Sequence, residues 1–218
     1  MDRVSNALQG APIVMWLAML SCVAPCVAQT SPDAEDAATR KAALTLATAV
    51  CGRCHGAEGR SADPAVPVIA AQQQSYIEVQ LKAFRAQRRQ DSGAHEDMRR
   101  IASAWLMNDQ IITGIASYFS SQTPARVKPG DPALVATGKQ LYENVNPERG
   151  VPACADCHGV DAEGLSVIPR LASQHALYLV GQMQRLRASL RDSRIMHGVV
   201  QDVSDNEIVA VATYLQSK

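Results

Sequence analysis

One six-residue pattern occurs twice in the sequence, as CGRCHG at residues 51–56 and as CADCHG at residues 154–159. The similarity extends beyond the motifs, because the segments 66–90 and 168–192 align without a gap. Several residue types that coincide in register indicate an internal duplication, which requires two copies of one fold. The matched pairs are Pro67 with Pro169, Gln72 with Gln174, Tyr76 with Tyr178, Gln80 with Gln182, and Phe84 with Leu186.

The two copies are separated by residues 121–138, a segment with three prolines and two glycines and no helical period. This composition is typical of a linker. We therefore predict an N-terminal domain at 29–124, a linker at 125–134 and a C-terminal domain at 135–218.

Both copies are predicted to be helical, which gives an all-α fold of two tandem domains. Each copy closes on an apolar segment that follows a residue suited to an N-cap, Asn108 in the first copy and Ser204 in the second. No stretch alternates between apolar and polar residues as a strand would.

Residues 1–28 have the composition of a secretory signal peptide. Arg3 supplies a positive start, an apolar stretch follows, and small residues ending at Ala28 offer a cleavage site. One alternative is an uncleaved membrane anchor, because residues 11–28 just reach the ~18 residues of a candidate span. Another is a lipid anchor on Cys22.

Cleavage removes Cys22 and Cys26, and every remaining cysteine lies in the repeated motif, so none is left for a structural disulfide. Aromatic residues make up only 4% of the chain, which indicates that another group fills the interior. The 21 basic and 21 acidic residues cancel, so nothing points to a nucleic-acid surface. The four motif cysteines are Cys51, Cys54, Cys154 and Cys157.

The pattern Cys-x-x-Cys-His is the attachment signature of c-type haem. Two thiols at this spacing reach the two vinyl groups of one porphyrin, and the next residue, His55 or His158, is then placed under the iron as its axial ligand. A thioredoxin-like site prefers a βαβ context, which the sequence lacks. A zinc site fits poorly because each histidine directly adjoins a cysteine. We therefore predict two covalently bound haem groups.

Each iron then needs a sixth ligand or an open face, and a thioether would give electron transfer rather than oxygen chemistry. Met98 follows His55 by 43 residues, and Met196 follows His158 by 38. Both methionines are predicted to lie in loop-like stretches before the last helix of their copy. We predict that they are the sixth ligands.

Other side chains compete for this role. Met107 stands just before the last helix of the first copy and has no counterpart in the second, and Met183 lies inside a predicted helix, where a core position is expected. His95 and His197 would give bis-histidine ligation, but they do not occupy equivalent positions in the repeat. We expect both histidines on the surface or behind the ligands.

Two further repeated features have a physical role. The carbonyl of Pro67 or Pro169 could accept a hydrogen bond from Nδ1 of the neighbouring motif histidine and orient it, although a turn proline has the same signature. Repeated arginines could pair with haem propionates or with an acidic partner, although a solvated helix face explains them equally well. These arginines are Arg85, Arg88 and Arg89 in the first copy and Arg185, Arg187, Arg191 and Arg194 in the second.

The sequence resembles the diheme class I cytochromes c, of the cytochrome c4 type, over nearly all of residues 35–218. The resemblance rests on the two motifs, on the Pro-x-[Ile/Leu]-Ala-x-Gln segments at 67–72 and 169–174, on the two methionines, and on the closing helices. It implies two small helical haem domains packed face to face with their propionates close together. It also implies a periplasmic location and the shuttling of single electrons between respiratory complexes.

The sequence departs from the family at Ala71 and Ser173, where the family often has glycine before the glutamine. A Cβ atom at these positions is expected to shift the backbone slightly near the haem.

Three functions are compatible with these motifs. The first is a soluble carrier between a quinol-oxidising complex and a terminal oxidase or reductase. The second is the electron-accepting subunit of a dehydrogenase, for example a flavoprotein that oxidises sulfur compounds. The third, an enzyme such as a peroxidase, requires an open haem face, which methionine candidates in both copies argue against. Membrane association is expected only if the N-terminal segment is retained.

Overall fold

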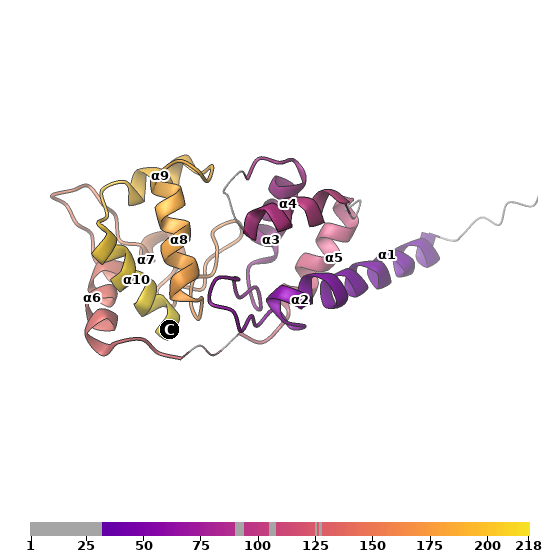
Figure 1. The fold of residues 1–218 in the computed structure, drawn as a ribbon, viewed down its shortest axis with the longest axis horizontal. Helices are drawn as coiled ribbons and strands as arrows, with labels where there is room; N and C mark the ends of the chain where they lie inside the picture. Colours follow the sequence, from indigo (N-terminus) through magenta and orange to yellow (C-terminus); the bar gives the residue numbers. More distant parts are fainter. Residues whose placement is uncertain (1–31, 90–93, 105–107, 125, 127) are drawn as a thin grey trace, which may run out of the picture. The chain divides into compact units, whose positions relative to one another are not determined.

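The computed structural model describes residues 32–218 apart from 90–93, 105–107, 125 and 127, and it leaves out the side chains of 32–35, 94 and 95. The predicted signal peptide at 1–28 thus lies outside the described residues. Residues 32–218 form one compact unit, and Figure 1 shows it as an assembly of helices. Within the described residues, β pairing is limited to two isolated bridges.

The two halves repeat one arrangement of helices. In the first half α1 and α3 both pack against α5, and α3 also packs against α4; in the second half α6 and α8 both pack against α10, and α8 packs against α9. The first half consists of α1 (Pro32–Leu46), the π-helical turn η1 (Ala47–Cys51), α2 (Gly52–His55), α3 (Gln74–Arg85), α4 (Ala94–Ala104) and α5 (Asp109–Ser120). The second half consists of α6 (Pro132–Glu143), α7 (Ala155–His158), α8 (Ala176–Arg187), α9 (Arg194–Val200) and α10 (Asp205–Ser217).

Side-chain caps explain where α5, α6 and α10 begin. Asn108 accepts a hydrogen bond from the Ile111 amide, and Ser204 accepts one from the Glu207 amide in a capping box, so both predicted N-caps are present. Helix α6 begins at Pro132, inside the predicted linker, because the Asp131 side chain accepts from two amides of its first turn and proline suits that turn.

Each half has its own small apolar core. In the first half it is built around Phe119 and Ile112, both fully buried, and in the second around Tyr142. Tyr142 also donates a hydrogen bond of 2.6 Å from its hydroxyl to the carbonyl of Gly159, the last residue of the second motif. The second core therefore holds the end of that motif.

The first and last helices of each half cross at a contact between small residues. In the first half a Cβ on Gly114 of α5 would lie 2.5 Å from the Cβ of Ala43 on α1. In the second half the glycine lies on the other helix: a Cβ on Gly138 of α6 would meet the Ala210 carbonyl oxygen of α10 at 2.0 Å. Both crossings need one glycine. In the first half it lies on the last helix, α5, and in the second half it lies on the first helix, α6.

We expect Gly114→Ala to lower the free energy of unfolding by about 1–3 kcal/mol, because the added methyl overlaps Ala43 and the helices must separate. Combining it with Ala43→Gly should restore most of that stability, since this removes the one clashing atom and exchanges the two helix propensities. Gly181→Ala is a matched control, because its Cβ would meet only the movable end of Arg185. Denaturant unfolding measures all three, and an unrescued double variant contradicts the crossing argument.

Candidate functional site

In each half the first motif cysteine immediately precedes a short helix, α2 or α7, that contains the second cysteine and the histidine. Residues three and four apart on a helical turn lie on the same face. The turn therefore presents two thiols and one imidazole together. These residues are Cys51, Cys54 and His55 in the first half and Cys154, Cys157 and His158 in the second.

The two thiols of each pair lie in different surroundings. Burial raises the pKa of the Cys51 thiol to about 11, and it does the same for Cys154. Cys54 and Cys157 are exposed, and none of these four cysteines forms a disulfide. Each pair thus spans the boundary between interior and surface, which suits a flat group with one edge in the core and one near solvent.

Each motif histidine is buried and bonded through one ring nitrogen. The distance from His55 Nδ1 to the Pro67 carbonyl oxygen is 2.9 Å, and that from His158 Nδ1 to the Pro169 carbonyl oxygen is 3.0 Å. Burial lowers the pKa of both histidines, although the carbonyl hydrogen bond opposes this. A carbonyl can only accept, so Nδ1 carries the proton and Nε2 keeps its lone pair for a metal.

These features fit covalently attached haem better than the alternatives. A same-face pair of thiols, a neutral imidazole with a free lone pair and small cores are what haem c requires. Among the described residues, no three His, Cys, Asp or Glu side chains gather to hold a metal ion.

Both predicted methionine ligands lie on helices, which corrects the expectation of loop-like stretches. Met98 belongs to α4 and packs against the first core, and Met196 belongs to α9, where its amide donates to the Ser193 cap. The cap explains the second helix, because it satisfies an amide of a short turn that the sequence alone made look irregular.

Two of the four side chains that compete with Met98 and Met196 as iron ligands make other contacts in the structure. Met183 packs against the second core, as expected of a core methionine. His197 Nδ1 lies 3.0 Å from the Leu186 carbonyl oxygen. Met107 and the His95 side chain lie outside the described residues.

Ala71 and Ser173 adopt the left-handed backbone conformation, with φ of 54° and 60°. The Ala71 amide donates to the Phe119 carbonyl at 3.0 Å, and the Ser173 amide donates to the Leu215 carbonyl at 2.9 Å. The same backbone bond thus forms in both halves despite the Cβ atoms. A side chain in this conformation carries a cost in backbone strain.

The repeated arginines do not act as one group. Arg85 bonds Asp109 at 2.8 Å and Arg187 bonds Asp205 at 2.5 Å, so each ties the end of one helix to the start of the last helix. Arg89, by contrast, is buried. Arg88 and Arg194 are exposed, as a solvated face predicts.

Two matched glutamines join the halves by reciprocal bonds, a role that the sequence did not reveal. The buried Gln174 accepts from the Val68 amide and donates to the Val68 carbonyl, both at 2.8 Å. Gln72 accepts from the Arg170 amide at 2.8 Å and donates to the Arg170 carbonyl at 2.9 Å. Each glutamine therefore pairs with the backbone of the opposite half, as expected for a two-fold contact.

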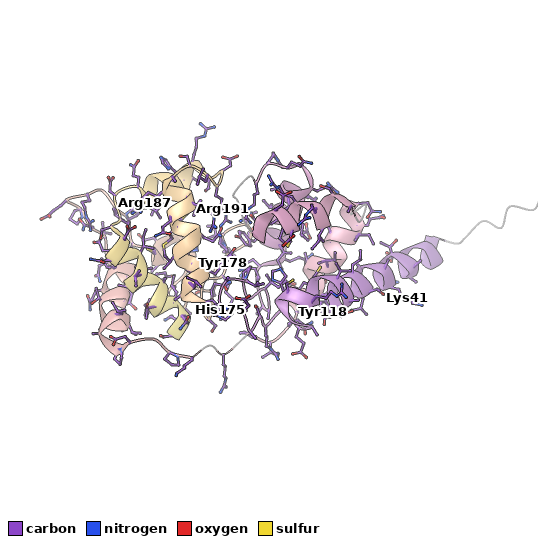
Figure 2. The ribbon with its side chains drawn as sticks, viewed as in Figure 1. Lys41, Tyr118, His175, Tyr178, Arg187 and Arg191 are labelled. Atoms are coloured by element: carbon purple, nitrogen blue, oxygen red, sulfur yellow. The ribbon has the colours of Figure 1, made fainter. Side chains whose placement is uncertain are left out.

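A second pair of bonds flanks the glutamines. Gln73 donates to the Glu163 carbonyl at 2.8 Å. His175, at the matching position and labelled in Figure 2, bonds the Ser61 carbonyl through Nε2 at 2.9 Å. The two halves thus use an amide and an imidazole for the same task.

Arginine side chains make the third set of contacts between the halves. Arg191, labelled in Figure 2, lies beyond the end of α8. Its guanidinium donates to the Tyr76 hydroxyl at 2.6 Å and to Gln80 at 3.3 Å. Arg89 bonds Gln182 at 3.2 Å in the reciprocal direction. The interface therefore contains the guanidinium groups of Arg89 and Arg191. The sequence alone left three roles open for them: pairing with haem propionates, pairing with an acidic partner, or a solvated helix face.

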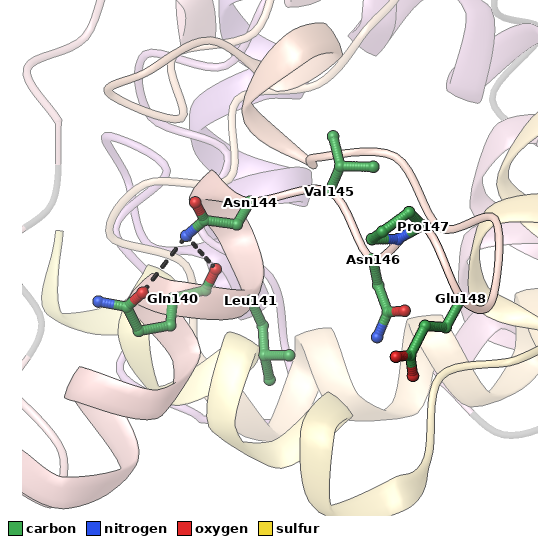
Figure 3. Close-up of a pocket in the computed structure, with 7 residues that line it drawn as sticks. All are labelled: Gln140, Leu141, Asn144, Val145, Asn146, Pro147 and Glu148. Carbon is green, nitrogen blue, oxygen red and sulfur yellow. Dashed lines mark hydrogen bonds between the residues drawn. The ribbon is translucent and has the colours of Figure 1, made fainter.

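A surface depression lies at the end of α6 (Figure 3). The residues that line it are Gln140, Leu141, Asn144, Val145, Asn146, Pro147 and Glu148. Inside it the Asn144 side chain donates to the Gln140 carbonyl at 2.8 Å. None of the predicted haem ligands and none of the motif residues lines this depression.

The sequence matches the cytochrome c family twice, over residues 41–123 and 135–218. It is 38% identical over 176 residues to cytochrome c4 of Thiocapsa roseopersicina, covering 78% of this chain and 88% of that protein. The crystal structure of reduced recombinant cytochrome c4 from Pseudomonas stutzeri is 33% identical with a TM-score of 0.72, covering 82% of this chain and 97% of that one. A protein named thiosulfate dehydrogenase electron acceptor, from Thiomonas intermedia, is 30% identical over 187 residues, covering 81% of this chain and 82% of that protein.

The chain therefore belongs to the cytochrome c family. Within that family it is of the diheme cytochrome c4 type, built from two tandem cytochrome c domains. It carries two covalently bound haem c groups and transfers electrons with redox partners rather than acting as an enzyme.

We expect Ala71→Gly to raise the free energy of unfolding by about 1 kcal/mol, because glycine relieves the left-handed strain while the amide bond to Phe119 is kept. Ser173→Gly should change stability little, since the same relief is offset by loss of the bond from the Ser173 hydroxyl to the Lys218 carbonyl. Denaturant unfolding of both variants checks this, and equal gains would contradict the assignment of that bond.

Proposed function

We propose that this protein is a periplasmic carrier of single electrons, exported by a signal peptide at 1–28. Its haem domains occupy 29–124 and 135–218, joined by the linker at 125–134. In each domain the motif cysteines anchor the haem covalently, and the iron is held between a histidine and a methionine. The anchoring residues are Cys51, Cys54, Cys154 and Cys157, the ligands are His55 with Met98 and His158 with Met196, and Pro67 and Pro169 orient the histidines.

The single observation that carries this proposal is the pair of buried histidines, each held through Nδ1 by a proline carbonyl. Haem c supplies a one-electron iron couple when bound, and the chain's residues decide its environment. A fixed histidine with a thioether partner leaves no coordination position open to substrate, which favours electron transfer. Met98 supports this by packing against the core of its half, where a haem is expected.

The partners proposed for the carrier are a quinol-oxidising complex as donor and a terminal oxidase or reductase as acceptor. Within the described residues, no helix is both long and apolar enough to cross a membrane. Any membrane attachment would then depend on the N-terminal segment, and no nucleic acid is expected to bind.

A second candidate function is the electron-accepting subunit of a dehydrogenase. It is favoured by the relative named thiosulfate dehydrogenase electron acceptor, which this chain resembles over both halves. The two candidates share the proposed ligands, so they differ only in whether a partner polypeptide stays bound.

We expect Met98→Ala to alter the low-spin spectrum and lower the reduction potential of one haem only, and Met196→Ala to alter the other, because a thioether ligand raises the potential. Met183→Leu is the matched control, since that side chain packs in the core and should leave both spectra unchanged. Absorption spectra and redox titration of the three variants decide the matter. Wild-type spectra in both alanine variants would remove these methionines from the proposal.

We expect native electrophoresis of a gently extracted periplasm, stained for haem, to give one band with the mass of the processed chain plus two haems. Mass spectrometry of that band also reports the cleavage site. A larger band with a second polypeptide, stable to salt, would instead favour the dehydrogenase subunit.

A further inference from the structure

We propose that Gln72 and Gln174 are positioning residues that tune the haem of the opposite half, so that each half sets part of the other's reduction potential. The inference rests on the proposed ligation by His55 and His158. It concerns the peptide group that follows each histidine-orienting proline.

One peptide group carries both bonds in the first half. Its carbonyl belongs to Pro67 and accepts from His55 Nδ1 at 2.9 Å, while its N–H belongs to Val68 and donates to Gln174 Oε1 at 2.8 Å. Gln174 is 5% exposed, so this bond is shielded from water. The glutamine of the second half therefore lies one peptide group away from the histidine of the first.

The second half repeats the arrangement with the roles exchanged. The Pro169 carbonyl accepts from His158 Nδ1 at 3.0 Å, and the N–H of the same peptide group, on Arg170, donates to Gln72 Oε1 at 2.8 Å. Gln72 is 6% exposed. Because both glutamines are duplicated and buried, the contact is a crossed pair rather than a single accidental bond.

Hydrogen bonds in series polarise one another. When the peptide N–H donates to a glutamine oxygen, electron density shifts toward the carbonyl oxygen of the same peptide group, which becomes a better acceptor. A stronger acceptor draws the Nδ1 proton and makes Nε2 a stronger donor to the metal. A more basic histidine favours the ferric state, so each glutamine lowers the potential of the opposite haem.

The same coupling acts in reverse, because linkage between two equilibria is reciprocal. If docking of the halves lowers a potential, oxidation must strengthen docking by the same free energy. The glutamine bonds are therefore tighter in the ferric protein than in the ferrous one.

The test replaces Gln174 by methionine, which keeps the length of the side chain and removes its hydrogen bonds. In the full-length protein with both haems, Gln174→Met should raise the potential of the N-terminal haem and leave the C-terminal haem unchanged, and Gln72→Met should do the opposite. NMR redox titration of resolved haem methyl signals assigns each potential. The Nδ1 proton of His55 in the reduced protein should shift upfield in Gln174→Met, while that of His158 should not.

Gln73→Met is the matched control. It removes a bond between the halves of the same chemistry, to the Glu163 carbonyl, that does not reach a histidine-orienting peptide group. It should leave both potentials unchanged. If every substitution shifts both haems alike, or if Gln174→Met shifts only its own haem, the crossed coupling is wrong and the glutamines merely hold the interface.

A measurement on the unaltered protein guards against misfolding of the variants. The Val68 and Arg170 amides should exchange with solvent more slowly in the oxidised than in the reduced protein, because the glutamine bonds that protect them are tighter in the ferric state. Equal rates in the two states overturn the inference. Intact His/Met spectra with unmoved potentials would also overturn it while leaving the proposed ligation in place, whereas lost spectra in the methionine variants of the proposed ligands concern the ligation alone.

Discussion

The hydrogen bond from each motif histidine to a proline carbonyl is the contact on which the rest of the site depends. It joins a short helix, fixed locally by the Cys-x-x-Cys-His spacing, to a loop that has no regular structure of its own. Without it the imidazole could rotate and present either nitrogen to a metal. With it the tautomer is settled, and the loop gains a fixed position from which the next peptide group reaches the other half.

The small size of the two apolar cores follows from the haem that each half is built to hold. A protein whose interior is completed by a prosthetic group does not need many aromatic side chains, and the two buried clusters are mostly aliphatic and alanine-rich. The helix crossings are tight as well: Gly114 faces Ala43, and Gly138 faces Ala210, so the terminal helices of each half approach closely. Close packing here fixes the frame from which the motif segment is held, as the bond from Tyr142 to the Gly159 carbonyl illustrates.

The sequence predicted what is local or periodic. The haem-attachment motif, the duplication and the caps at Asn108 and Ser204 are each read from a few neighbouring residues, and the structure has those helices and caps where the pattern put them. Helix α9 was missed because its only signal was a serine cap before a short turn. The role of Gln72 and Gln174 was missed although their match was noticed, because their partners lie about a hundred residues away and are backbone atoms, which no side-chain pattern records.

The duplication also explains how the two halves can differ while sharing one design. In a two-fold contact every position occurs twice, so a change on one side alters a bond whose counterpart on the other side is kept. The two halves differ at the position that follows the glutamines, which is Gln73 in the first half and the buried His175 in the second. Both side chains bond a carbonyl group of the other half. The glutamines themselves have not diverged. The two positions require different chemistry, because each glutamine both accepts from and donates to the backbone of one opposite residue. The flanking position needs only a donor, which an amide or an imidazole can supply. The glutamines are therefore kept in both halves, and with them the bonds to both histidine-orienting peptide groups, while the neighbouring position is free to differ.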